Sequence, residues 1–238
     1  TTTILQKMTK KVAILQSNYI PWKGYFDIIA EVDEFILYDE VQFTKRDWRN
    51  RNKIKTPQGL CWLTIPVITK NNFHQKISQT KIDGHTWKRK HWNSLRLNYK
   101  KAKYFEEISD LLHEFFHSTN LETLSEANST LLALICQYLG IKTKITSCTE
   151  FALSNERNGR LISICEQTGA DTYLSGCSAK EYIDIKSFTD SGIKVEWIDY
   201  EGYPEYKQLW GAFMHEVTII DLLFNCGKES PLFMKHTI

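Results

Sequence analysis

The chain lacks the long apolar run that a membrane-spanning helix needs. Its 238 residues contain no stretch of about 18 consecutive apolar residues, so we expect no transmembrane helix and no membrane partner. A charge excess of either sign is also absent, because 30 Lys and Arg residues face 28 Asp and Glu residues. This balance excludes a strongly basic, histone-like binder and an acidic disordered chain.

Cysteine pairs with the CxxC spacing are absent as well. The six cysteines are Cys61, Cys136, Cys148, Cys165, Cys177 and Cys226. Scattered among apolar neighbours, they indicate reduced thiols rather than a disulfide framework or a four-cysteine zinc site. The first eleven residues contain one apolar pair, Ile4 and Leu5, where a secretion signal has a longer apolar run. We therefore expect a cytoplasmic protein.

Repeats, low-complexity tracts and flexible linkers are not found, so one domain is expected over residues 1–238. Apolar runs predict strands at 11–16 and 34–39 with a short helix at 25–30 between them. Such a βαβ unit indicates a parallel sheet. Further strands are expected at 60–67, 75–82, 172–175 and 194–200, and helices at 87–99, 104–139, 161–167 and 217–224. The predicted fold is α/β with a mainly parallel sheet and a helical insertion near 100–150.

Positive charge is concentrated in two segments despite the balanced total. Residues 44–55 hold six basic side chains and one acid, and residues 81–103 hold eight and one. If the segments meet, they form a cationic cleft suited to phosphate, which guanidinium groups bind bidentately; two solvated faces are the alternative. Trp48 lies among the arginines of the first segment and offers a ring for stacking on a base or a sugar. The near-neutral chain disfavours nucleic acid as the partner.

Two motifs resemble the opening of the WbqC-like protein family: residues 13–27 (AILQSNYIPWKGYFD) and 39–52 (DEVQFTKRDWRNRN). Later pieces at 87–99, 173–176 and 206–227 extend the resemblance over roughly residues 11–227. The family is associated with bacterial surface-polysaccharide (O-antigen, lipopolysaccharide) gene clusters. The resemblance implies an acyl- or glycine-type aminoacyltransferase, or an amino-acid thioesterase.

The first motif is also similar, more distantly, to the first turn of the nucleotidylyltransferases, in which two histidines hold phosphates. Trp22 and Tyr25 stand at those places here. The similarity therefore implies a nucleotidylyltransferase-like N-terminal βαβ unit without nucleotidyl transfer.

Acyl transfer to an amine needs an activated donor, a base and donors for the oxyanion. We expect a thioester of coenzyme A or of an acyl or peptidyl carrier protein as donor, and the amine of a nucleotide-linked amino sugar as acceptor. No bound cofactor or metal is expected, and a homo-oligomer is compatible with the sequence. The alternatives are a thioesterase, with water in place of the amine, and a non-catalytic module that binds a nucleotide or a carrier protein.

Three residues are candidates for the chemistry. Asp39, after the second predicted strand, is a general base or amine anchor, or else a loop cap or a partner for Arg46 or Arg49. His91 is a second candidate base, or a structural residue on the helix surface. Cys177, in a turn before a helical stretch, is a candidate nucleophile or a bystander.

Substrate-binding candidates follow the predicted strand ends or belong to the two motifs, because α/β folds place ligands at strand ends. The arginines among them would contact phosphate, the tryptophans would stack, and the glycine turn would offer backbone N–H groups. They are Gln16, Asn18, Tyr19, Trp22, Arg46, Trp48, Arg49, Asn50, Arg51, Ser175, Gly176 and Ser178.

One further pattern has two interpretations. His113 and His117 belong to the segment HEFFH, which matches the zinc-hydrolase pattern HExxH. The apolar residues around them form an amphipathic stripe, which favours an ordinary helix.

Overall fold

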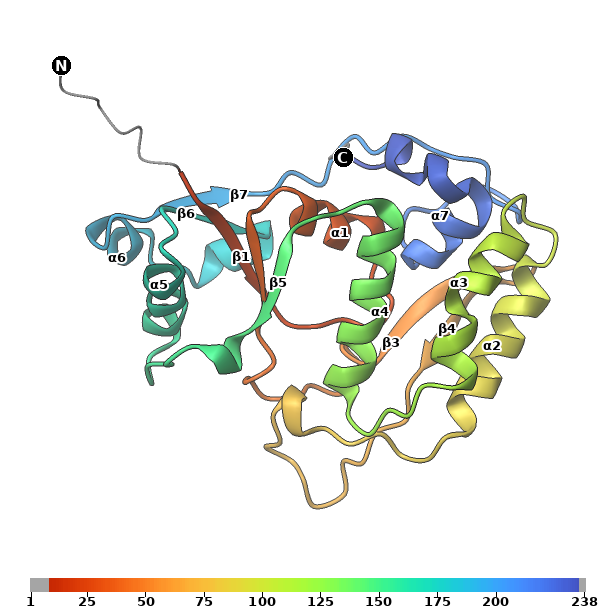
Figure 1. Cartoon of the computed structure of the whole chain (residues 1–238), viewed down its shortest axis with the longest axis horizontal. Helices are drawn as coiled ribbons and strands as arrows, with labels where there is room; N and C mark the ends of the chain where they lie inside the picture. The colour runs from red at the N-terminus through yellow and green to blue at the C-terminus, as the bar shows by residue number, and fades with distance from the viewer. Residues whose placement is uncertain (1–8, 236–238) are drawn as a thin grey trace.

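The structure, a computed structural model, describes residues 9–235 (Figure 1). The segment in which a secretion signal was judged absent lies mostly outside this range. Within it, five strands form a sheet in the order β5-β2-β1-β6-β7, and every neighbouring pair is parallel. They are β1 (Lys11–Leu15), β2 (Glu34–Leu37), β5 (Lys144–Ser147), β6 (Thr172–Ser175) and β7 (Lys194–Trp197). The predicted α/β class with a mainly parallel sheet is confirmed.

The central strand β1 explains why this sheet needs helices on both faces. Val12 and Ile14 point into one apolar core, which also contains Leu161, Ile164 and Phe188. Ala13 points into the other core, with Phe35 from β2. Strands that are apolar on both faces are typical of parallel sheets covered by helices.

Helices α5 (Arg157–Thr168) and α6 (Ile185–Asp190) supply the first of these cores. Helices α1 (Lys23–Ala30), α4 (Leu124–Leu139) and α7 (Ile219–Cys226) supply the second. Within the described residues no helix is long and apolar enough to cross a membrane.

A second, smaller unit extends the core beyond the sheet. Strands β3 (Arg51–Thr56) and β4 (Gly59–Thr64) form an antiparallel hairpin. Helices α2 (Thr86–Tyr99) and α3 (Phe105–His117) pack against each other beside it. Figure 1 shows these two helices at the opposite end of the molecule from α5 and α6.

Three local expectations differ from the structure. Strand β3 was not predicted, because its sequence RNKIKT is mostly polar and basic although half of its residues are buried. Residues 75–82 are not a strand; they contain a 3-10 turn, Ile77–Gln79, flanked by isolated bridges. The segment near 100–150 contains α3 and α4 as expected, but its end forms β5 at the edge of the sheet.

Candidate functional site

The loops that follow β1 and β2 are joined by Asp39. Its carboxylate accepts hydrogen bonds from the backbone N–H and the hydroxyl of Ser17, at 2.8 and 2.7 Å, and from the Ser125 hydroxyl at 2.6 Å. The residue is 5% exposed. Asp39 therefore takes the loop-capping role that the sequence left open, and this geometry gives no support to its role as a base.

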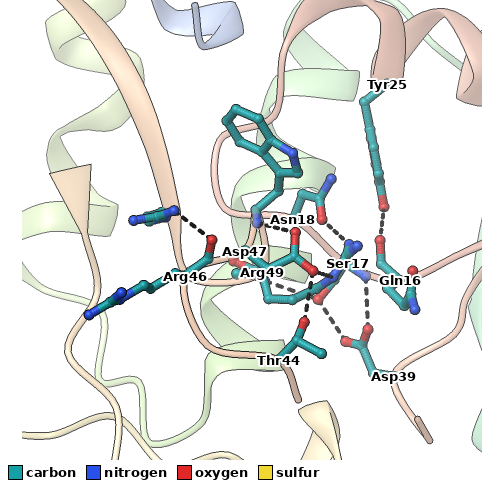
Figure 2. A network of polar contacts seen from close by, with 12 residues as sticks. Gln16, Ser17, Asn18, Tyr25, Asp39, Thr44, Arg46, Asp47 and Arg49 are labelled. Atoms are coloured by element: carbon teal, nitrogen blue, oxygen red, sulfur yellow. Dashed lines mark hydrogen bonds and ion pairs between the residues drawn. The ribbon is translucent and has the colours of Figure 1, made fainter. Parts of the chain in front are cut away.

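Arg49 lies between the same loops and orients Asn18 (Figure 2). Its guanidinium donates to Oδ1 of Asn18, and its Nε lies 3.8 Å from the Asp47 carboxylate. Its backbone carbonyl accepts from Asn128 on α4 at 2.9 Å. These contacts place Arg49 in the framework of the loop, and because it lines neither cavity the expected phosphate role gains no support.

The loop after β1 is also held in a strained conformation. Ile20 has φ +36°, in the left-handed region that β-branched residues rarely adopt. On either side of it, Tyr19 N–H donates to the Trp48 carbonyl at 3.1 Å, and the Pro21 carbonyl accepts from Ile219 at 2.9 Å. Strain of this kind persists where the surroundings over-determine the backbone, often at ligand sites.

A cavity of about 350 Å³, here called the aromatic cavity, opens beside this loop. It is lined by Asn18, Pro21, Trp22, Trp48, Asn52, His215 and Glu216. Trp48 is 41% exposed, and its ring lies 5.6 Å from that of Trp62. Three of the predicted binding residues, Asn18, Trp22 and Trp48, are thus brought to one place.

Trp22 is fixed in the cavity wall by its neighbours. Its ring lies edge-on to Tyr200 at 5.1 Å and to Tyr203 at 5.5 Å. The indole also covers Gly24, where a Cβ atom would overlap it. The glycine of the segment PWKG is therefore required by the tryptophan two residues before it.

Asn18 lines the aromatic cavity and carries a free donor. Because arginine has only donors, the atom of Asn18 that faces Arg49 is the amide oxygen. The Nδ2 group then has no hydrogen-bond partner within the part of the chain that the structure describes. An N–H group fixed in this way is suited to stabilising an oxyanion.

His215 is a functional candidate that sequence reasoning missed. It lies on the irregular segment between β7 and α7, exposed at the aromatic cavity, with its ring edge-on to Phe213 at 4.5 Å. Partial burial, together with the positive charge of Lys23, lowers the pKa of His215 below 6.5. The imidazole is therefore mostly neutral at pH 7 and able to accept a proton.

A second cavity, of about 540 Å³, lies at the carboxyl ends of β1, β2 and β6 and is here called the strand-end cavity. Gln16, Ser175, Gly176 and Ser178 line it, as does Tyr38 after β2. Seven of the twelve predicted binding residues therefore line one of two cavities, and the other five, Tyr19, Arg46, Arg49, Asn50 and Arg51, line neither.

His91 is not on the helix surface, contrary to expectation. It is 5% exposed, with Nδ1 2.8 Å from the Tyr19 hydroxyl and Nε2 3.1 Å from the Thr64 carbonyl. A carbonyl only accepts, so Nε2 carries the proton and Nδ1 accepts from Tyr19. Burial lowers the pKa of His91 to about 4. Both nitrogens are occupied, and a role as base finds no support here; Tyr19 is likewise a buried structural partner.

The remaining arginines and Asn50 serve the hairpin. Arg51 donates to the Arg46 carbonyl at 2.5 Å, and its guanidinium lies 4.1 Å from the centre of the Trp62 ring. Asn50 is buried and donates to the Ile65 carbonyl at 2.9 Å. These three residues lie outside the lining of both cavities.

Cys177 is exposed at the start of a short 3-10 turn, and its thiol lies 3.3 Å from the Ile198 carbonyl. It lines neither cavity. His113 and His117 stack at 4.2 Å on α3, and no group of three metal-ligating side chains occurs among residues 9–235. The zinc interpretation of HEFFH therefore gains no third ligand from the described residues.

Comparison with known proteins places the chain in a sequence family. The model of the WbqC-like protein family matches residues 16–232. An uncharacterized protein of Mycobacterium tuberculosis is 52% identical over 227 residues, which cover 95% of this chain and 98% of that protein. No solved structure matches the chain significantly.

Proposed function

The chain belongs to the WbqC-like protein family, and we propose that it is an acyl- or aminoacyltransferase. In this proposal it moves an acyl group from a thioester to the amine of a nucleotide-linked amino sugar. The observation that carries the proposal is the aromatic cavity, where two tryptophan walls, a neutral histidine and a fixed amide donor meet.

The walls of the cavity suit a sugar ring. Trp22 and Trp48 offer apolar ring faces, on which the C–H face of a sugar can pack. Asn18, His215 and Glu216 supply polar groups at the same cavity for hydroxyl or amine groups. Mostly apolar walls with a few convergent polar groups are the usual form of a small-molecule site.

The reaction assigns tasks to two of these polar groups, His215 and Asn18. The sugar amine attacks the thioester carbonyl as its proton passes to His215, and a C–N bond forms. The carbonyl oxygen becomes an oxyanion, which the Nδ2 group of Asn18 stabilises. The C–S bond then breaks, the carbonyl re-forms, and the thiolate takes up the proton that His215 received from the amine. The products are an amide and a free thiol.

Thermal denaturation against a ligand panel tests this proposal. The panel contains nucleotide-linked amino sugars, the same sugars without the amine, coenzyme A thioesters and a short RNA. A ligand present at a hundred times its Kd stabilises by about 2.7 kcal/mol, which raises Tm by several degrees in a protein of this size. We expect that rise with the amino sugars, and a smaller rise in Trp48→Ala, which loses only the contact with the sugar ring.

Phe73→Ala is the matched control, because Phe73 is also an exposed aromatic residue but does not line the cavity. A flat response to every nucleotide-linked sugar contradicts the proposed acceptor. A rise that Trp48→Ala leaves unchanged places the sugar elsewhere. A rise with thioesters alone favours hydrolysis over transfer.

A further inference from the structure

The strand-end cavity lies where the order of the sheet reverses. From β1 the chain passes through α1 to β2 on one side, and later returns to β6 on the other side of β1. In open α/β sheets, ligands bind at the carboxyl ends of the strands at this switch point. Leu15 and Gln16 of β1 and its loop, and Ser175 of β6, line the cavity at that point.

The charge of this cavity favours an anion. Lys76, Arg157 and Arg160 line it together with a single carboxylate, Glu40. Lys76 is already paired with Glu40 at 2.6 Å. Arg157 and Arg160 form no ion pair with any residue between 9 and 235, so their positive charge remains uncompensated there.

Arg160 carries an unpaired donor. One of its terminal nitrogens donates to the Asn155 carbonyl at 3.1 Å, but its Nε–H is buried and has no hydrogen-bond partner among the described residues. A buried donor without a partner is rare and costs about 1–3 kcal/mol. The guanidinium group of Arg160 lines the cavity and can form charge-assisted hydrogen bonds with an anionic oxygen there.

The rest of the lining suits a ring system. Tyr38, Leu161, Tyr173 and Ala179 supply apolar and aromatic surface. Tyr182 also lines the cavity, and the Arg157 guanidinium lies 3.6 Å from the centre of its ring, which holds that cation at the rim. A volume of about 540 Å³ is more than a single phosphate fills and lies within the range of small-molecule sites.

We propose that the strand-end cavity binds the nucleoside diphosphate part of a substrate, with Arg157 and Arg160 on the phosphates and the base against the apolar wall. This site would belong to the proposed transferase, and the identity of its substrate rests on that proposed function. Two substrates carry this chemistry: the nucleotide-linked sugar and coenzyme A. Both cavities border the same loop, through Gln16 in one and Asn18 in the other.

Calorimetric titration without any acyl donor tests the site. The probes are UDP, ADP, coenzyme A and inorganic pyrophosphate. We expect at least one nucleoside diphosphate to bind, more tightly than pyrophosphate, and Arg160→Gln to weaken its Kd at least tenfold. Lys186→Gln is the matched control, since Lys186 is an exposed cation on α6 that lines neither cavity. Unchanged Tm values for both variants establish that the fold is intact.

The pattern of binding shows which substrate the strand-end cavity holds. Tight UDP binding without coenzyme A binding assigns the site to the sugar nucleotide, and the reverse assigns it to the acyl donor. Absence of binding by UDP, ADP and coenzyme A overturns the inference, as does an Arg160→Gln variant with the wild-type Kd.

The proposed function fails independently of this site. Trp48→Ala should leave UDP binding unchanged, because Trp48 belongs to the other cavity. If UDP binds but no acyl transfer occurs, the proposed transferase activity is wrong and the nucleotide site is supported. If the protein acylates a free amino sugar but binds no nucleotide, the transferase activity is supported and the nucleotide site is wrong.

Discussion

Arg49 fixes the amide of Asn18 in one orientation by donating a hydrogen bond to its Oδ1 atom. The arginine is itself held by Asn128 of α4 through its backbone carbonyl and lies near Asp47 through its side chain. Arg49 therefore acts on the aromatic cavity indirectly, whereas Trp48 of the same motif lines it directly. Arg49 sets the position of one donor in the loop after β1.

The variant Asn18→Asp tests that donor. The new carboxylate would still accept from Arg49, so Tm should change little, but the N–H group that Asn18 brings to the aromatic cavity in the proposed mechanism would be lost. Removal of one oxyanion donor typically lowers kcat by about 10²–10³-fold. We expect a loss of that size in kcat with a smaller change in KM. A variant with wild-type kcat would show that Asn18 does not touch the reacting carbonyl.

The lowered pKa of His215 predicts an acidic limb in the pH–rate profile. As a base it must be neutral, and its pKa lies below 6.5 because of burial and Lys23. Activity should therefore be present at pH 7 and fall as the pH drops through that lowered pKa. In His215→Gln the limb should disappear and kcat should fall about 10²–10⁴-fold. His117→Gln, at an exposed histidine on α3, serves as control; a limb that survives in His215→Gln assigns the base elsewhere.

The lowered pKa of the buried His91 predicts that the protein loses stability in acid. Its folded pKa of about 4 lies below the ordinary value of 6.5, so the native state disfavours the protonated ring. The stabilisation is complete above pH 6.5 and is lost as the pH falls from 6.5 to about 4, by roughly 3 kcal/mol in total. Urea unfolding of wild type and His91→Gln at pH 7 and pH 4.5 measures this. Parallel losses in the two proteins would contradict the assignment.

Gly24 should respond to alanine in the direction opposite to an ordinary helical glycine. Alanine in a helix is normally favoured by roughly 0.5–1 kcal/mol, but a Cβ atom on Gly24 would overlap the Trp22 indole. We expect Gly24→Ala to destabilise by about 1–3 kcal/mol and to weaken sugar binding. A Cβ atom on Gly176 would lie 4.0 Å from the nearest side-chain atom, so the Tm of Gly176→Ala should barely change. Equal Tm values in the two variants would contradict the packing argument.

The sequence predicted the sheet better than the hairpin. The apolar runs of β1, β2 and β6 are readable because strands covered on both faces are almost wholly apolar. Strand β3 buries Asn52 and Lys55, whose polar groups find partners only after the chain has folded. No local pattern reveals such partners.

The two cavities were predictable to different degrees. The rule that ligands bind at strand ends located Gln16 and Ser175. The same rule could have found Arg157 and Arg160, because the helix that follows a parallel strand begins at that edge of the sheet. His215 could not be found in this way, since it belongs to an irregular segment, which reaches Trp22 only through tertiary packing.

Amide formation on an amino sugar can be detected by mass spectrometry of the reaction product. The purified protein is incubated with an acyl or aminoacyl thioester and a nucleotide-linked amino sugar, with free thiol measured in parallel. We expect a sugar nucleotide heavier by the acyl group, formed in step with the thiol and lost in His215→Gln. Thiol release without an acylated sugar, or no turnover with any donor, would show that the protein is not this transferase.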